Sequence, residues 1–299
     1  MLSKALPPNI GDGLPNLLEI TLGGNMFEGH IPASLGNALG LQVIDLSNNR
    51  FTGQIPTFFG KLSNLTILNL ELNQLEARDS KDWEFLNALT NCQFLNILSL
   101  SYNQLQGSIP QTIGNLSPSL ENLLISGNSL SGHVPREIGK LSALTRLELG
   151  ENNLSGTVER WIGNLTCLQL LNIHSNCFSG SIPSSIGNLT RLTYLFASEN
   201  DFQGLIPASL GNLPLLNLSL GSNNLQGYIP PNLGNLQELI VLNLSHNNLR
   251  GDIPQITNLK QLTVLDLSSN NFEGLIPASL GNLPLERLIL SSNNLQGFE

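Results

Sequence analysis

The sequence predicts a repeat solenoid, in which short coils stack along one axis and each coil adds one strand to a parallel β-sheet. Three observations predict this fold class. A short pattern of leucines that ends in asparagine recurs along the whole chain of 299 residues. Ten of the eleven intervals between these asparagines are 23 to 25 residues long, and the other is 30. Glycine and proline punctuate the repeats at similar places.

The recurring pattern is L-x-x-L-x-L-x-x-N, as in the segment from Leu144 to Asn152. Its L-x-L core alternates with period two, which predicts a strand whose leucines face the core and whose third, fifth and seventh residues face outward. Asparagine both donates and accepts hydrogen bonds, so stacked copies can join the turn of one coil to the backbone of the next. The asparagines stand at positions 25, 49, 73, 103, 128, 152, 176, 200, 223, 247, 270 and 293.

The second half of each repeat reads L-x-G-x-I-P and then G-N-L, as in residues 249–254 and 234–236. Glycine permits the bend, and proline suits an edge that needs no N–H donor. No single coil can bury its leucines, so the repeats must stack to form a continuous core. One repeat has Glu159 at the proline position, and the sequence offers no functional reason for it.

The extended pattern L-x-G-x-I-P-x-x-(L/I)-G-N-L, seen in residues 107–116 and 180–189, resembles the plant-specific class of leucine-rich repeat. The long repeat, residues 75–94, resembles a segment of the extracellular domains of one subfamily of plant receptor-like kinases, which includes sensors of bacterial proteins. We therefore expect an α/β-type leucine-rich-repeat solenoid of about 12 repeats. It should form a right-handed, curved superhelix with a parallel concave sheet and a mostly non-helical convex side, as one domain over residues 1–299.

The long repeat should contain a short helix from Asp82 to Leu89, because Trp83, Leu86 and Leu89 recur at spacing three and share a face. The favoured interpretation is that Trp83 and Phe85 pack this insertion onto the solenoid. Contact with a partner is the alternative.

The resemblance implies a signal peptide, cysteine-bearing caps, a transmembrane helix and a serine/threonine kinase. The segment 1–299 shows none of them, so the sequence is interpreted as an internal, uncapped fragment with apolar coil ends exposed at Leu6, Ile10, Leu288 and Leu290. Residues 1–18 lack the apolar run of a signal peptide, so the chain taken literally would remain cytosolic. The resemblance instead implies the extracellular face of the plasma membrane.

Composition and motifs disfavour several function classes. The net charge of −9 disfavours a nucleic-acid partner, and no apolar run approaches the length that inserts into a membrane. No catalytic motif occurs, and the four histidines are too scattered to share a metal, so we expect neither an enzyme, a metal nor a cofactor. Cys92, Cys167 and Cys177 form no C-x-x-C motif and should be three unpaired thiols.

The outward positions of three adjacent strands carry the richest side chains, which predicts a binding patch. Glu151 and Glu199 lie at its rim. The plainer interpretation is a set of solvated residues in which Arg146 pairs with Glu148. The predicted ligand-binding residues are Arg146, Glu148, Asn172, His174, Tyr194 and Phe196.

Seven N-x-(S/T) sequons occur, and such sites receive sugar only in the secretory pathway. Asn217 and Asn243 lie on the predicted concave strands, where a glycan would obstruct binding, so we expect both to be unoccupied. The candidate glycosylation sites are Asn64, Asn115, Asn153, Asn164 and Asn188.

The function that these patterns favour is recognition of a peptide or protein ligand, as in the sensing domain of a plant receptor-like kinase in defence or development, with a leucine-rich-repeat co-receptor as a further partner. Two alternatives remain open. One is a secreted inhibitor of microbial polygalacturonase, and the other is a truncated fragment without function.

Overall fold

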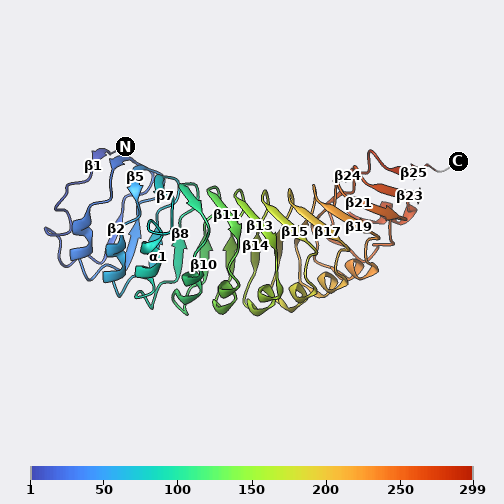
Figure 1. The fold of residues 1–299 in the computed structure, drawn as a ribbon. Helices are drawn as coiled ribbons and strands as arrows, with labels where there is room; N and C mark the ends of the chain where they lie inside the picture. Colours follow the sequence, from blue (N-terminus) through green and yellow to red (C-terminus); the bar gives the residue numbers. More distant parts are fainter. Residues whose placement is uncertain (1, 298–299) are drawn as a thin grey trace. The chain divides into compact units, whose positions relative to one another are not determined.

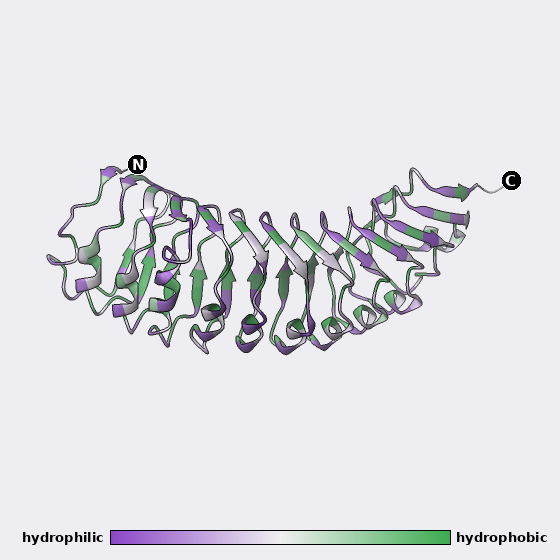
Figure 2. Cartoon of the chain, in the orientation of Figure 1, coloured by the Kyte–Doolittle hydropathy of each residue, from purple (hydrophilic) through white to green (hydrophobic). Residues whose placement is uncertain are grey.

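The computed structural model describes residues 2–297 and consists of stacked coils, each with a short strand from its L-x-L motif (Figure 1). The chain divides into two compact units, Met1–Leu154 (unit 1) and Ser155–Glu299 (unit 2), and each is described by itself. Hydrophobic and hydrophilic residues alternate around every coil (Figure 2), which is the pattern that stacking requires.

The L-x-L motifs form a parallel sheet in each unit, which we call the LxL sheet. The central leucines stand in register, as Leu98, Leu123 and Leu147 do in unit 1, and all three are fully buried. Unit 1 contains β2 (Glu19–Thr21), β4 (Val43–Asp45), β6 (Ile67–Asn69), β8 (Ile97–Ser99), β10 (Asn122–Leu124) and β12 (Arg146–Glu148). Unit 2 contains β14 (Leu170–Asn172), β16 (Tyr194–Phe196), β18 (Asn217–Ser219), β20 (Val241–Asn243), β22 (Val264–Asp266) and β24 (Arg287–Ile289). This confirms the predicted fold class.

A second parallel sheet, which the sequence did not predict, follows the asparagines, and most of its strands include the L-x-G glycine; we call it the LxG sheet. Unit 1 contributes β1 (Ser3–Ala5), β3 (Met26–Gly29), β5 (Arg50–Gln54), β7 (Gln74–Ala77), β9 (Gln104–Gly107) and β11 (Ser129–His133). Strand β13 (Asn153–Thr157) contains the boundary between the units. Unit 2 contributes β15 (Cys177–Gly180), β17 (Asp201–Gly204), β19 (Asn224–Gly227), β21 (Asn248–Gly251), β23 (Asn271–Leu275) and β25 (Asn294–Gln296).

Short 3-10 helices fill most of the remaining side of the coils, each placing a leucine, isoleucine or phenylalanine in the core. They are η1 (Ala33–Asn37), η2 (Thr57–Lys61), η3 (Gln111–Asn115), η4 (Arg136–Lys140), η5 (Arg160–Asn164), η6 (Ser184–Asn188), η7 (Ala208–Asn212), η8 (Pro231–Asn235) and η9 (Ala278–Asn282). A proline in extended conformation precedes every one except η5. Glu159 adopts that extended conformation there (φ −86°, ψ −178°), so the backbone path is kept without proline.

The insertion in the long repeat contains α1 (Glu84–Leu89), which begins two residues later than the expected helix and ends at the expected residue. Trp83 is buried, stacks on Phe85 with ring centroids 5.4 Å apart, and donates its Nε1–H to the backbone oxygen of Gln106 at 3.0 Å. Both aromatic side chains therefore pack the insertion onto its neighbouring coils, as the favoured interpretation held.

The repeat asparagines join consecutive coils. Asn73 Nδ2 donates to Leu46 O of the preceding coil at 3.0 Å, and its Oδ1 accepts the Phe51 N–H, also of that coil, at 3.0 Å. The same Nδ2 also lies within hydrogen-bonding distance of two carbonyls of its own turn, those of Leu70 and Glu71. Asn49, Asn152, Asn223, Asn247 and Asn270 repeat this arrangement. The predicted coil-to-coil bridge is confirmed.

The structure also bears on the exposed coil ends and the unpaired cysteines that the sequence predicts. Leu6 was expected to be exposed, which is wrong: it is 6% exposed, whereas Leu288 is exposed as expected. The three cysteines are unpaired, as predicted. Cys92 Sγ donates to the carbonyls of Phe59 and Leu62, and burial raises the pKa of its thiol to about 11.

Replacing Asn223 by alanine should lower the free energy of unfolding of unit 2 by about 2–4 kcal/mol, because it leaves several buried backbone groups without a partner. Asn223 donates to Ala197 O and accepts from Phe202 N. The adjacent Asn224 is exposed and provides a matched control, for which Asn224→Ala should change stability by less than about 0.5 kcal/mol. Urea unfolding followed by circular dichroism measures both, and equal midpoints would contradict the role of the ladder.

Candidate ligand-binding surface

The outward side chains of the LxL sheet form rows, because equivalent residues of successive repeats pair across the strands. In unit 2, Tyr194 pairs with Leu170 and Phe196 pairs with Asn172. The leucines between them are buried, whereas these four side chains are exposed or half-buried. The sheet therefore presents a continuous surface whose chemistry is set by the outward positions alone.

Arg146 and Glu148 lie on β12 of unit 1 and form an ion pair through Arg146 Nε and Glu148 Oε1. The arginine side chain is half exposed and the glutamate side chain is mostly covered. This is the pairing that the plainer interpretation named. An exposed pair of this kind contributes little to stability, so the guanidinium can exchange its partner at small cost.

Tyr194 and Phe196 on β16 of unit 2 stack on each other, with ring centroids 6.2 Å apart and an interplanar angle of 19°. Tyr194 is 38% exposed, and Phe196 is half-buried. Two aromatic rings held parallel on a rigid strand offer apolar area with little side-chain entropy to lose on binding.

A hydrogen-bonded chain lies beside these rings in unit 2. Ser175 Oγ donates to Glu199 Oε2 at 2.7 Å, and His174 Nδ1 lies 2.9 Å from the same Oγ. Asn172 Oδ1 accepts the His174 backbone N–H at 3.2 Å. Sequence analysis named Asn172, His174 and Glu199 but missed Ser175, which joins the rim to the patch. The Ser175 contact could not be predicted because it depends on a left-handed backbone at Ser175 (φ 49°) and Glu199 (φ 56°). These are the positions before the repeat asparagines.

The predicted patch is thus divided between the units. Arg146 and Glu148 belong to unit 1, and Asn172, His174, Tyr194 and Phe196 belong to unit 2. Within unit 2 the predicted residues occupy two adjacent strands and the turn that follows β14. The grouping of all six as one site stays a prediction.

Tyr102 in unit 1 is a further residue that the sequence patterns did not indicate. Its ring lies over Gly127, where a side chain on the glycine would collide with it, and its hydroxyl donates to Glu151 Oε1 at 2.8 Å. The Glu151 hydrogen bond, followed by burial and by the negative charges of Glu151, Glu148 and Glu71, raises the pKa of Tyr102. The bridge places the rim residue Glu151 against an aromatic ring on the outward side of the LxL sheet.

The candidate glycosylation sites Asn64, Asn115, Asn153, Asn164 and Asn188 are all exposed. Asn217 and Asn243 are half-buried, and each accepts a side-chain hydrogen bond, from Ser219 at 2.8 Å and from Ser245 at 2.7 Å. The two groups of sequons therefore differ in solvent access.

Within residues 2–297, no three histidine, cysteine or acidic side chains are grouped so that they could hold a metal ion. Over the same described range, no helix has the length and apolar character needed to cross a membrane.

Models of the leucine-rich-repeat family match the chain in several places. The description "Leucine rich repeat" matches residues 118–178 and 142–202, and "Leucine Rich Repeat" matches residues 40–62, 94–116 and 214–236. A two-copy model, "Leucine Rich repeats (2 copies)", matches residues 237–278. The matches fall on the repeats that the structure shows as coils.

Known proteins are similar to this chain in sequence and structure. Receptor kinase-like protein Xa21 of Oryza sativa subsp. japonica is 43% identical over 53 residues, which are 18% of this chain and 5% of that protein. The structure of PEPR1-AtPEP1 has a TM-score of 0.90 at 38% identity, over 98% of this chain and 41% of that one. The plant peptide hormone receptor RGFR1, in complex with RGF2, has a TM-score of 0.87 at 35% identity, over 95% and 44%.

A leucine-rich-repeat protein of Leptospira interrogans, LIC12759, has a TM-score of 0.79 at 31% identity, over 99% of this chain and 71% of that one. The chain belongs to the leucine-rich-repeat family. Its repeats are of the kind found in the ectodomains of plant receptor kinases, which are ligand-binding modules. It spans less than half of the two plant receptor chains and 5% of Xa21 in these matches.

The Tyr102 bridge predicts a specific pH dependence. The native state holds the Tyr102 proton more tightly than the unfolded chain, whose tyrosine pKa is about 10. The stabilisation is therefore complete below that pH and is lost as pH rises through the raised native pKa. Ultraviolet titration should show a late phenolate step, which Tyr102→Phe removes and Glu151→Gln moves to lower pH. A late step that survives Tyr102→Phe would contradict this assignment.

Proposed function

We propose that this chain is the ligand-recognition part of the extracellular domain of a plant receptor-like serine/threonine kinase, and that it binds a peptide or protein ligand. The observation that carries the proposal is the match, over 95–98% of the chain, to the plant structures RGFR1 with RGF2 and PEPR1-AtPEP1. The first of these relatives is a plant peptide hormone receptor in complex with RGF2.

The proposed contact surface is the LxL sheet, centred on Tyr194 and Phe196 in unit 2. The stacked rings would accept apolar side chains of the ligand, and Asn172 and His174 would supply hydrogen bonds at one edge. On unit 1, Arg146 and Glu148 are proposed to contact a charged group of the ligand, because a partly exposed ion pair can exchange partners.

The mechanism is equilibrium binding on a rigid surface, with no chemical step on this chain. The signal would pass to a kinase elsewhere in the same receptor and to a co-receptor with leucine-rich repeats. A solved relative, HAESA in complex with the peptide hormone IDA and the co-receptor SERK1, supports that arrangement at 28% identity and a TM-score of 0.56. The corresponding location is the extracellular face of the plasma membrane.

Double substitution of Tyr194 and Phe196 by alanine should weaken ligand binding at least about tenfold, since buried aromatic anchors dominate such interfaces. The measurement is a biolayer-interferometry screen of the secreted chain against synthetic plant signalling peptides and purified bacterial proteins. Each binder is then titrated against the variant.

The matched control is Val264→Ala, because Val264 occupies on β22 the position that Tyr194 occupies on β16. It should leave the affinity unchanged. If a saturable binder has equal affinity for the wild type and the double variant, the placement of the site is wrong. If neither class of probe yields a saturable binder, the recognition function itself is contradicted.

A further inference from the structure

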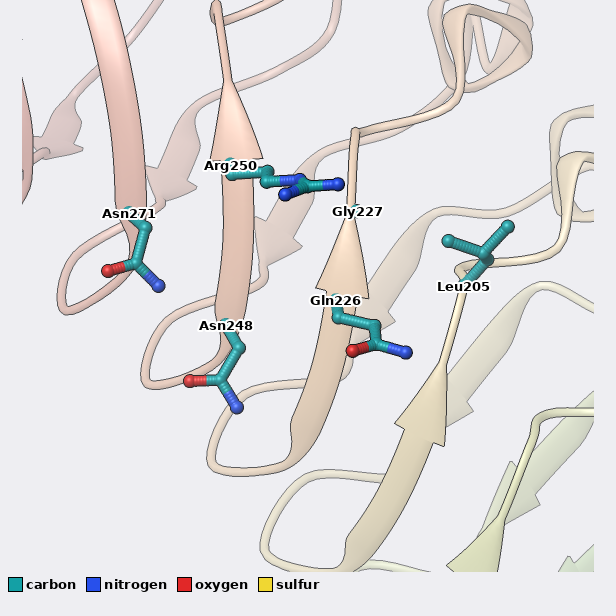
Figure 3. A pocket seen from close by; sticks show the side chains of 6 residues that line it. All are labelled: Leu205, Gln226, Gly227, Asn248, Arg250 and Asn271. Atoms are coloured by element: carbon teal, nitrogen blue, oxygen red, sulfur yellow. The ribbon is translucent and has the colours of Figure 1, made fainter.

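A groove of about 530 Å³ lies on the LxG sheet of unit 2, away from the outward rows of the LxL sheet (Figure 3). Its floor is formed by strands β19, β21 and β23, which carry most of the lining residues. The glycine at 227 keeps it open, since a β-carbon there would approach Leu205 Cδ2 to 2.5 Å. The lining residues are Leu205, Gln226, Gly227, Asn248, Arg250 and Asn271.

Arg250 is the charged side chain that lines this groove. Its guanidinium carbon lies 5.7 Å from the centroid of the Tyr228 ring, a cation–π contact that fixes the direction of the side chain. Figure 3 shows the side chain crossing from β21 toward Gly227 on β19. Among the described residues, no carboxylate forms an ion pair with Arg250, although Asp252 follows it closely in sequence and Glu273 lies on the neighbouring strand β23. Asp252 instead lies over Gly274, one repeat further on.

In the strand register, Arg250 and Gln226 of this groove stand opposite neutral partners. Arg250 pairs with Asn271 across β21 and β23, and Gln226 pairs with Asn248 across β19 and β21. All three carboxamide side chains are exposed, so their N–H groups are open to a ligand. Five guanidinium donors and three carboxamides facing one groove match the acceptor oxygens of a carboxylate.

Unit 1 contains a corresponding groove, but there an arginine stands opposite a carboxylate. It measures about 520 Å³ and is lined by Ala5, Glu28, Gly29, Arg50, Thr52 and Gln74. There Glu28 stands opposite Arg50 in the strand register, so the groove carries its own counter-charge. In the unit 2 groove, by contrast, the register partner of Arg250 is the neutral Asn271.

Large apolar side chains follow three of the four L-x-G glycines in this part of unit 2, and Asp252 follows the other, Gly251. Leu205 and Tyr228 are each 63% exposed, and Leu275 is 52% exposed. Exposed leucine and tyrosine beside an oriented arginine are the composition of a protein interface rather than of a solvated surface.

We propose that this groove is a second binding surface, which takes a protein partner that presents an aspartate or glutamate side chain next to apolar side chains. The carboxylate pairs with Arg250 and accepts from the carboxamides, while the apolar side chains cover Leu205, Tyr228 and Leu275. The surface is separate from Tyr194 and Phe196, so its failure would leave the proposed recognition site on the LxL sheet untouched.

The test is nuclear magnetic resonance of the isotope-labelled chain with two blocked tetrapeptides, one of alternating leucine and glutamate and one of alternating leucine and glutamine. The glutamate peptide should shift the Arg250 Nε–H signal and the side-chain amides of Gln226, Asn248 and Asn271 in a saturable way. The glutamine peptide should bind about tenfold more weakly, as expected for loss of a charge-assisted contact.

Arg250→Gln should produce the same tenfold loss for the glutamate peptide, whereas Arg50→Gln, the matched control in the unit 1 groove, should produce none. Both positions are exposed, and unchanged circular dichroism verifies the fold of each variant. Equal binding of the two peptides, binding that survives Arg250→Gln, or no saturable shift overturns the proposal. Saturable shifts with a uronic-acid oligosaccharide and none with the peptide would also overturn it, because the carboxylate would then belong to a saccharide.

Discussion

The whole structure depends on hydrogen bonds made by one asparagine side chain per repeat. In the turn at Asn152, Nδ2 bonds to the backbone oxygen of Ile125 in the preceding coil, while Oδ1 accepts the N–H of Leu130. Asn152 is only 8% exposed, so loss of its side chain leaves these backbone groups at a buried site without their partner. They fix the register of one coil on the next, and the buried leucines can then stack into a continuous core.

This constraint also arranges the surface. The residue before each ladder asparagine is held in the left-handed region, as at Tyr102, Glu151 and Glu199. That conformation is strained for most residues, and the surrounding hydrogen bonds hold it in place. The result is a rim of side chains along the LxL sheet, in which Tyr102 reaches Glu151 and Ser175 reaches Glu199. A uniform framework thereby presents variable chemistry at fixed spacing, which is what a recognition surface requires.

Periodicity was enough to predict the LxL sheet, its buried leucines and the asparagine bridges, because each repeats many times in the sequence. The LxG sheet was missed, since most of its strands include a glycine with positive φ, and the pattern L-x-G was interpreted as a bend. The stacked pair Tyr194 and Phe196 could be placed from the alternation of one strand. The Tyr102 bridge and the Arg250 groove could not be predicted from the sequence, because each brings together residues from different repeats. Their contacts also depend on a glycine that lies between those residues.

The central claim is that the chain belongs to a receptor of the secretory pathway and binds its ligand on the LxL sheet, and a glycopeptide map of the native protein from plant tissue tests both parts. The account predicts sugar at sites among the exposed Asn64, Asn115, Asn153, Asn164 and Asn188, and none at Asn217 or Asn243. Sugar at Asn217 or Asn243 would cover the proposed face and contradict its role. A map with no sugar at any of the seven sequons would contradict passage through the secretory pathway.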